Sequence, residues 1–484
     1  MPHQPQRLQA GLQAPSLAPS ARDWRYTPEV PPQPDRRQFL SGAAAFALAG
    51  PFLQFRERVE RGAGAAVADD GYGRQTPARD ESTGLTLLEV PEGFRYWSFS
   101  WRGDRLEDGR ITPGAHDGMA AFAAPDGRIR LVRNHELDAD IGPFGAAPTY
   151  DARGSGGTTT VEFDPVRRSA RAWASLCGTL RNCAGGPTPW GSWLTCEETL
   201  DEPRSANRFS KPHGYVFEVP AEGQASPEPL KGLGRFVHEA VAIDPATGIV
   251  YLTEDHGSAG FYRFVPSTPG RLGAGGRLEM LAISGRARHD TRINQRSGTT
   301  FTVHWVPIAD PDRAHQADRW GDAQGVSSQG WQRGAAVFAR LEGAWYGGGA
   351  IYFAATSGGN AGSGQIWEYV PGKESLRLIF ESPGPSVLDR PDNLAVSPRG
   401  GIALCEDGGG AVQRIHGMTP DGRLFPFIRN RVTLRGERLG YRGDFRDREF
   451  AGVCFSPDGQ WMFFNIQTPG MTFAVTGPWE RGKL

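Results

Sequence analysis

The chain has few cysteines, almost no net charge and no apolar run long enough to cross a membrane. Its 484 residues include five cysteines, at positions 177, 183, 196, 405 and 454. An odd and sparse set of this kind excludes a disulfide framework, although a bridge between Cys177 and Cys196 stays open from the sequence alone. The formal net charge of −1 excludes a global electrostatic attraction to nucleic acid or to an acidic membrane surface.

Several catalytic signatures are also absent from the sequence. It has no Gly-rich phosphate loop, no GxSxG nucleophile elbow and no HExxH zinc motif. Apart from one apolar run near the N-terminus, no window keeps a 3.6-residue apolar period, which excludes a helical bundle. Glycine and proline are abundant instead: 65 and 38 residues, about a fifth of the chain against a usual share of about 12%. Because 38% of residues are hydrophobic, we expect short strands joined by turns rather than disorder.

Residues 35–55, DRRQFLSGAAAFALAGPFLQF, contain the most specific short motif of the chain. Arg36 and Arg37 form a pair that precedes a modest Ala/Gly-rich apolar run. This arrangement resembles a twin-arginine translocation signal, which the export machinery reads as an address. A short hydrophobic helix after a chance arginine pair is the alternative. The apolar run is too short for a stable membrane span, which needs about 20 residues.

We therefore expect residues 1–68 to be a disordered N-terminus that carries an export signal, and the protein to be periplasmic or extracellular. The residues before position 35 are rich in Pro, Gln and Ala, which is typical of disorder. Ala66-Val67-Ala68 offers a small-residue cleavage site. The twin-arginine route exports folded proteins, often with a cofactor already loaded, so it suits a protein that needs controlled metal insertion.

A repeat runs through the rest of the chain. Each unit has an acidic or small residue, an apolar strand, a Pro/Gly turn, a second apolar strand and a polar end. Four units are clear, namely EAVAIDPATGIVYLTED from Glu239, EGAWYGGGAIYFAATS from Glu342, DNLAVSPRGGIALCED from Asp392 and AGVCFSPDGQWMFFNIQ from Ala451. Two diverged units lie at residues 116–136 and 182–198.

Six short, similar β-units predict an all-β fold, a six-bladed β-propeller, because radial repetition leaves few exposed sheet edges. We assign the propeller to residues 111–484 as the catalytic domain, and residues 69–110 to an N-terminal extension that packs on it. A β-sandwich repeat is the rival fold, but it accommodates six units in one closed core less easily. In a propeller, polar residues at the strand ends of all units can converge on one pocket.

Acidic residues recur at equivalent positions of these units. Pairs close the second strand in three units, and single acids open the first strand in three: Glu197-Glu198, Glu254-Asp255 and Glu406-Asp407, with Glu239, Glu342 and Asp392. A ring of carboxylates repels itself unless protons or cations neutralise it. Oxygen ligands suit Ca²⁺, and a thiolate from Cys183 would suit a transition metal such as iron. The alternatives are solvated loop entrances for the acidic pairs and an inert thiol for Cys183.

Arg340 lies two residues before Glu342, so in a strand both side chains point the same way. An arginine that faces cations is repelled unless an anion lies between them, and its planar fork fits a phosphate or carboxylate. A plain ion pair between Arg340 and Glu342 is the alternative.

At these residues the sequence resembles the PhoX-type alkaline phosphatases, a family of metal-dependent six-bladed propellers exported by the twin-arginine route. The matching segments extend over nearly all of the chain after the leader: LVRNHE (131–136), NCAGGPTPWGSWLTCEE (182–198), FVHEA (236–240), the TED and CED strand ends, FARLEG (338–343), RPDNL (390–394) and NIQTPGMTFAVTGPW (465–479). The block at 182–198 is highly specific.

The resemblance implies hydrolysis of phosphate monoesters at a centre that combines an iron pair, as Fe³⁺, with Ca²⁺ ions. Cys183 would then be an iron ligand, Glu342 an iron or bridging ligand, and Arg340 would hold the phosphate. The remaining metal contacts would come from carboxylates of the repeated pairs and strand starts, namely Glu197, Glu198, Glu239, Glu254, Asp255, Glu406 and Asp407.

Two other functions remain open from the residues alone. A Ca²⁺-dependent propeller lactonase or esterase would need one catalytic cation and no thiolate ligand. A non-catalytic propeller that serves as a binding platform would need neither. For the phosphatase we expect small phosphate esters and the twin-arginine machinery as partners, no specific nucleic acid partner, and a monomer.

Overall fold

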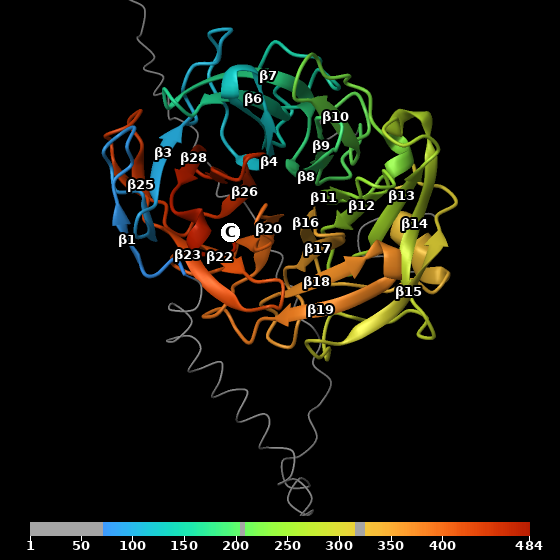
Figure 1. Ribbon diagram of the computed structural model, residues 1–484. Coiled ribbons are helices and arrows are strands. Elements are labelled where there is room, and N and C mark those ends of the chain that lie inside the picture. Colours follow the sequence, from blue (N-terminus) through green and yellow to red (C-terminus); the bar gives the residue numbers. More distant parts are fainter. Residues whose placement is uncertain (1–70, 204–208, 315–324) are drawn as a thin grey trace, which may run out of the picture. The chain divides into compact units, whose positions relative to one another are not determined.

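The computed structural model describes residues 71–203, 209–314 and 325–484, which belong to one compact unit. The leader predicted over residues 1–68 lies outside the described residues. Strands dominate the described part (Figure 1), and its α-helix α2 (Val326–Gln332) is short. No helix among the described residues has the length and apolar character that a membrane span requires.

The strands form antiparallel meanders that each start at the centre and run outward (Figure 1). In chain order the meanders are β4 (His116–Ala123), β5 (Ile129–His135), β6 (Gly156–Asp164) and β7 (Ser169–Thr179); β8 (Asn182–Pro187), β9 (Ser192–Glu197) and β10 (Val216–Pro220); β11 (His238–Ile243), β12 (Val250–Glu254), β13 (Phe261–Pro266), β14 (Gly276–Ile283) and β15 (Thr300–Pro307); β16 (Leu341–Gly347), β17 (Ala350–Ala355), β18 (Gln365–Val370) and β19 (Ser375–Glu381); β20 (Pro391–Val396), β21 (Ile402–Glu406), β22 (Arg414–Met418) and β23 (Leu424–Asn430); and β26 (Phe450–Phe455), β27 (Met462–Ile466) and β28 (Met471–Thr476).

The first strands of the meanders are the innermost ones, and they contact one another in a closed cycle, β4–β8–β11–β16–β20–β26–β4. This arrangement confirms the predicted β-propeller. Each predicted unit corresponds to the first two strands of one meander. The strand β15 pairs with both β14 and β19, so two meanders share one nine-stranded sheet.

Residues 71–110 contribute strands to the sheets themselves. β3 (Arg95–Phe99) pairs with β28, and β2 (Leu88–Pro91) pairs with β23 and with β1 (Gln75–Ala78). The last meander of the chain is therefore completed by a strand from the N-terminal side. A small hairpin, β24 (Thr433–Arg435) with β25 (Arg442–Asp444), follows β23.

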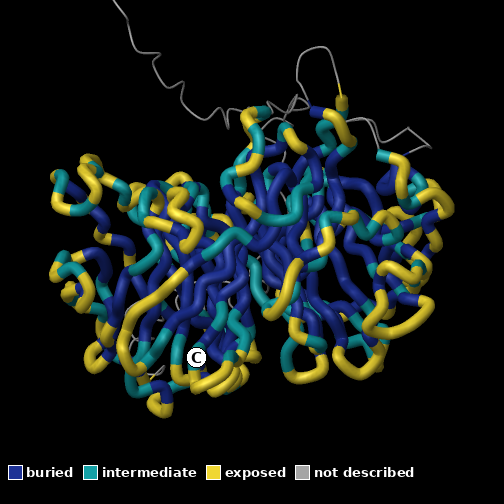
Figure 2. Tube along the Cα trace, turned by 90° about the horizontal axis from the view of Figure 1, so that it is seen from above, coloured by how far each residue is buried: buried dark blue, intermediate teal, exposed yellow. Residues whose placement is uncertain are grey.

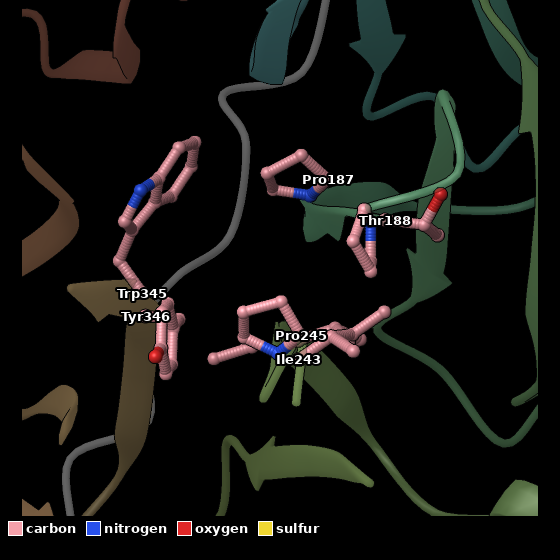
Figure 3. Close-up of a pocket in the computed structure, with 9 residues that line it drawn as sticks. Pro187, Thr188, Ile243, Pro245, Trp345 and Tyr346 are labelled. Atoms are coloured by element: carbon pink, nitrogen blue, oxygen red, sulfur yellow. The ribbon is translucent and has the colours of Figure 1, made fainter. Parts of the chain in front are cut away.

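Apolar side chains from neighbouring sheets pack together between the sheets, and exposure is concentrated in the connecting loops (Figure 2). At the ends of β8, β11 and β16 the side chains of Pro187, Ile243, Pro245 and Trp345 line an apolar pocket (Figure 3). Trp345 also packs against several of the apolar clusters. This end of the innermost strands is apolar, and the acidic side chains of these strands lie at the opposite end.

Candidate metal centre

The second residue of each innermost strand forms what we call the inner ring: Asp117, Cys183, Glu239, Glu342, Asp392 and Ala451. A register shift occurs at this point of every innermost strand. In β11, for example, His238 pairs with Glu254 and Val241 with Leu252, so two residues face one across the ladder. Equivalent shifts occur in β4, β8, β16, β20 and β26. A β-bulge bends a strand and re-aims its side chains, which explains how the inner ring turns toward shared neighbours.

Seven side chains gather here, and we call them the ligand cluster. They fall into three groups, and within each group one ligand atom per residue lies within 4.8 Å of the others: Asp117, Glu136 and Cys183; Cys183, Glu198 and Glu239; and Glu239, Glu342 and Asp392. Cys183 and Glu239 each belong to two groups, which links the three. Cys183 Sγ lies 3.1 Å from Glu239 Oε1.

The ligand cluster carries an electrostatic cost in the absence of cations. Burial raises the pKa of Glu239 well above its ordinary value, and the carboxylates of Glu342 and Glu198 raise it further. Burial and the carboxylates around Cys183 likewise raise the pKa of its thiol. Glu239 is fully buried, and its Oε2 has no hydrogen-bond partner among the described residues. A buried acceptor without a donor is costly, and a cation removes that cost, so these residues fit a metal site.

Gln467 hydrogen-bonds to two carboxylates of the ligand cluster, Asp117 and Glu136. Its Nε2 donates to Asp117 Oδ2 at 3.2 Å and to Glu136 Oε2 at 2.5 Å. Burial, followed by repulsion from Glu136 and Asp392, raises the pKa of Asp117 well above its ordinary value. An amide that donates to two carboxylates holds them apart at a defined spacing without adding charge.

A hydrogen-bond chain supports Asp117 from behind. Arg133 Nη1 donates to Thr472 Oγ1, Thr472 Oγ1 donates to Asn465 Oδ1, and Asn465 Nδ2 donates to the Asp117 carbonyl, each at 2.6 Å. Arg133 is fully buried, and burial lowers its pKa to about 9. The chain joins four strands, β5, β28, β27 and β4.

Arg340 borders the cluster beside Glu342. Its Nη2 donates to Glu342 Oε1 at 2.6 Å, and Nε and Nη2 donate to the two oxygens of Asp255 at 2.7 and 2.8 Å. Burial alone would lower the pKa of this guanidinium, but Asp255 and Glu342 raise it overall. About a third of the side chain, 32%, remains exposed. A permanent positive charge therefore lies at the solvent side of the cluster.

The first member of each acidic pair lies apart from the ligand cluster. Successive strand residues point to opposite faces, so when Glu198 faces the cluster Glu197 faces away. These first members are buried and accept hydrogen bonds from the loops around them: Glu197 from the amides of Leu180, Gly214 and Tyr215, Glu254 from the Gly260 amide and the Tyr262 hydroxyl, and Glu406 from the Asp389 amide and the Arg414 guanidinium. They tie the connecting loops to the ends of the second strands.

Among the predicted site residues, the structure brings Cys183, Glu198, Glu239 and Glu342 together. Asp255 donates no ligand atom to the three groups, but it contacts Arg340 and interacts with Glu198 of the cluster, and the backbone amide of Asp407 donates to the carbonyl of Arg390. Asp392, which the sequence placed in the ring of carboxylates but not among the expected metal contacts, belongs to the cluster, and the sequence reasoning missed Asp117 and Glu136. A signal existed, because Asp117 follows His116 as Glu239 follows His238, and both pairs begin an innermost strand.

The cysteines are all buried free thiols. The bridge between Cys177 and Cys196 that the sequence left open is therefore not formed. Cys177 lies near the carbonyl of Gly145 and Cys196 pairs with Val216 in the sheet, so neither belongs to the ligand cluster.

Comparisons with known proteins agree with this architecture. A family model described as "Alkaline phosphatase PhoX" matches residues 71–168 and 149–470. The structure is similar to PhoX of Pseudomonas fluorescens in complex with vanadate, a transition-state analogue, with 16% sequence identity and a TM-score of 0.62 over 85% of this chain and 98% of that chain. No curated protein sequence matches the chain.

Other solved propellers are less similar. A gluconolactonase from Xanthomonas campestris is 12% identical, with a TM-score of 0.39 over 84% of this chain and 98% of that chain. A catalytically inactive virginiamycin B lyase from Staphylococcus aureus with quinupristin is 11% identical, with a TM-score of 0.37 over 79% and 99% of the two chains. Similarity at this level carries no information on function.

Proposed function

The chain belongs to the PhoX family of alkaline phosphatases, which are phosphomonoesterases, and we propose that it hydrolyses phosphate monoesters at a centre of iron and calcium ions. Membership of this family implies dependence on metal. The observation that supports the site most strongly is the ligand cluster, in which one thiol and six carboxyl groups share a buried space. Without cations most of these groups would have to be protonated.

The donor set supports the proposed metals. Cys183 would be an iron ligand, because thiolates select transition metals over calcium. The carboxylates of Asp117, Glu136, Glu198, Glu239, Glu342 and Asp392 would complete the iron sites and hold the calcium ions, since carboxylate oxygens suit hard cations. When bound, the cations would polarise the phosphoryl oxygens and lower the pKa of an attacking water.

The protein residues supply orientation and charge. Arg340 would hold the phosphoryl group, because its guanidinium is fixed by Asp255 and Glu342 and part of it faces solvent. A donor fixed in this way stabilises the charge that develops in the transition state without reorganising. Glu197, Glu254 and Glu406 remain predictions as metal ligands, and their present hydrogen bonds favour an anchoring role for the loops. Asp407 likewise remains a predicted ligand.

The family is typically exported, and we propose the twin-arginine route for this chain on the strength of the Arg36-Arg37 motif. The substrates would be small phosphate esters outside the cytoplasm, and the protein would act as a monomer. This setting fits phosphate scavenging.

Elemental analysis of the folded protein, together with hydrolysis of p-nitrophenyl phosphate before and after chelation, tests the proposal. We expect iron and calcium in defined ratios and turnover that a chelator abolishes and the metals restore. Full activity in metal-free protein would contradict it.

The thiol separates the phosphatase from a lactonase or esterase with one calcium ion. We expect Cys183→Ala to lose iron and at least about a hundredfold in turnover, a size typical for loss of one group that stabilises the transition state. Cys177→Ala is the matched control, because this buried thiol lies outside the cluster. If Cys183→Ala kept its iron and its activity, the single-calcium alternative would replace the proposal.

A further inference from the structure

Three arginines occupy equivalent positions around the ligand cluster. Arg181, Arg340 and Arg390 each precede an inner-ring residue by two positions, and their φ angles are 45°, 46° and 54°. The carbonyl of each accepts the amide hydrogen of the residue that follows its second strand: Glu198 at 2.9 Å, Thr356 at 2.8 Å and Asp407 at 3.0 Å. A left-handed conformation is uncommon for a bulky side chain. The same φ and the same hydrogen bond occur at Ala115, two residues before Asp117, so this backbone arrangement belongs to the ring, and at three of its positions the residue is an arginine.

Arg181 shares one feature of the surroundings of Arg340, an acidic residue that follows the second strand of the preceding meander, whereas its second acidic neighbour comes from a different position of the unit. Arg340 lies between Asp255, which follows the second strand of the preceding meander, and Glu342. Arg181 Nη2 lies 3.5 Å from Glu136, which follows the second strand of its own preceding meander, and 3.6 Å from Glu198. The exposed fractions of the two side chains are also alike, 34% for Arg181 and 32% for Arg340.

Arg390 lacks these surroundings. The residue that follows the second strand of its preceding meander is Thr356, which offers no carboxylate, and Arg390 is exposed. Arg181 is therefore the second arginine that borders the ligand cluster. Arg390 occupies the equivalent backbone position without these acidic neighbours, so it serves as the comparison.

Arg181 and Arg340 border different parts of the cluster. Arg340 contacts Glu342, a member of the group with Glu239 and Asp392, whereas Arg181 lies beside Glu136 and Glu198, which belong to the two groups that share Cys183. Their innermost strands, β16 and β8, are separated in the cycle by β11. Glu198 also attracts the Arg340 guanidinium electrostatically, so the two arginines have this carboxylate as a common neighbour.

We propose that Arg181 binds a second anionic group of the substrate, a carboxylate or phosphate on the leaving-group side, and so selects monoesters whose leaving group is negatively charged. The inference rests on the proposed function, in which Arg340 holds the phosphoryl group. Cations that bind Glu136 and Glu198 neutralise the carboxylates beside Arg181, which frees its positive charge for an anion. A guanidinium fork matches both carboxylate and phosphate oxygens.

The test compares two phosphonates that cannot be hydrolysed and differ by one carboxylate, propylphosphonate and 3-phosphonopropionate. Calorimetry on the metal-loaded protein measures their affinities for the wild type, Arg181→Gln, Arg181→Lys and Arg390→Gln. We expect the wild type to prefer 3-phosphonopropionate, and Arg181→Gln to lose about tenfold of that preference, the size of one charge-assisted hydrogen bond. Arg390→Gln should keep the preference.

Kinetics provide a second measurement on the same variants. We expect Arg181→Gln to raise KM for 3-phosphoglycerate about tenfold with little change in kcat, and to raise KM for p-nitrophenyl phosphate by a smaller factor, because a group that binds the leaving side contributes equally before and in the transition state. Metal content is measured in each variant. If Arg181→Gln fails to load metal, the preference for 3-phosphonopropionate is measured on Arg181→Lys instead, because this variant keeps the positive charge and loses the guanidinium fork.

Three results would overturn the inference. Equal losses of affinity for both phosphonates would mean that Arg181 contacts the phosphoryl group. An equal effect of Arg390→Gln would mean that Arg181 acts only through the general positive potential of the rim. An unchanged preference in both Arg181 variants would mean that Arg181 does not bind the substrate. All three can occur in an enzyme that hydrolyses p-nitrophenyl phosphate, whereas failure of the proposed function would show as no hydrolysis by the wild type.

Discussion

Glu197 and Glu198 are adjacent in the sequence, yet their carboxylates have different surroundings. Glu197 accepts backbone amide hydrogens and lies 2.6 Å from His213 Nδ1, whereas Glu198 belongs to the ligand cluster. The alternation of side chains along a strand separates them. This acidic pair therefore combines a residue suited to anchoring a loop with a residue suited to binding a cation.

The raised pKa of Glu239 predicts how the stability of metal-free protein depends on pH. In the unfolded chain this carboxyl ionises near 4.5, whereas in the fold burial and Glu342 raise its pKa well above that value. From pH 4.5 upward the folded state binds more protons than the unfolded state, so the free energy of unfolding falls as the pH rises. We expect the Tm of chelated protein to fall from pH 5 to pH 8.

The variant Glu239→Gln should flatten this dependence, because an amide has no proton to lose, and should also weaken metal binding. Calorimetric melting of chelated wild type and variant measures the slopes, with the metal-loaded wild type as the reference that lacks the effect. Equal slopes for the chelated wild type and Glu239→Gln would contradict the assignment to Glu239.

The hydrogen-bond chain behind Asp117 gives a second prediction for single residues. Thr472→Val keeps the volume of the side chain and removes both bonds of Thr472, which leaves Arg133 and Asn465 without those partners. We expect a loss of about 1–3 kcal/mol in the free energy of unfolding, together with weaker cation binding near Asp117. Denaturant unfolding and calcium titration measure the two effects.

Thr302→Val is the control for this substitution, because Thr302 lies exposed on β15. If Thr472→Val destabilised the protein no more than Thr302→Val, the chain would have no part in holding Asp117.

At the scale of elements, the bulges of the innermost strands require small residues where neighbouring strands meet. Gly343 follows Glu342 in β16, and a Cβ at this position would lie 2.6 Å from the Asp392 carbonyl oxygen and 2.6 Å from the Leu394 amide nitrogen of β20. Backbone atoms cannot yield as a flexible side chain does. The spacing of Glu342 and Asp392 therefore depends on the absence of a side chain at Gly343.

We expect Gly343→Ala to cost about 1–3 kcal/mol, the usual range for overpacking, and to reduce metal content because it separates β16 from β20. Gly372→Ala is the matched control, since a Cβ there meets open space. Thermal melting and elemental analysis of both variants provide the measurement. Normal metal content in Gly343→Ala would show that the spacing of these strands tolerates change.

At the scale of the whole molecule, the ring is closed by a strand from the N-terminal side. Tyr96 in β3 is fully buried, and its hydroxyl accepts the amide hydrogens of Leu87 and Leu88 and donates to the carbonyl of Ala78. One side chain thus joins β3, which pairs with β28, to the segment that pairs with β23. Residues near both ends of the described chain are held together at this point.

We expect Tyr96→Ala to destabilise the protein by about 3–5 kcal/mol, as loss of a large buried aromatic ring does. Tyr96→Phe should cost about 1 kcal/mol, because it removes the hydrogen bonds and keeps the ring. Denaturant unfolding of both variants, with hydrogen exchange of β28, measures closure of the ring. A loss for Tyr96→Ala no greater than that for Tyr96→Phe would contradict this role.

Local patterns were sufficient for the fold and for part of the site. The period of two, the Pro/Gly turns and the recurrence of similar units predicted the propeller, because these features depend on neighbours along the chain. Glu198, Glu239 and Glu342 were identified because each occupies a repeated position, and Cys183 because a thiolate suits a transition metal and because the resemblance implies it. Asp117 and Glu136 escaped because their unit has diverged, so that the sequence shows the unit but its residue-by-residue match to the others rests on one signal, the pairs His116-Asp117 and His238-Glu239.

The sequence by itself determined that the chain forms repeated β-units whose strand ends carry acidic residues, because local periodicity and composition decide both. Only the tertiary structure decided that Glu198 and not Glu197 joins the cluster, that β3 completes the last meander, and that Arg181 and Arg340 both border the cluster. These properties depend on bulges, on pairing between distant strands and on the closure of the ring. Contacts between residues that are far apart in the chain leave no local pattern from which they can be predicted.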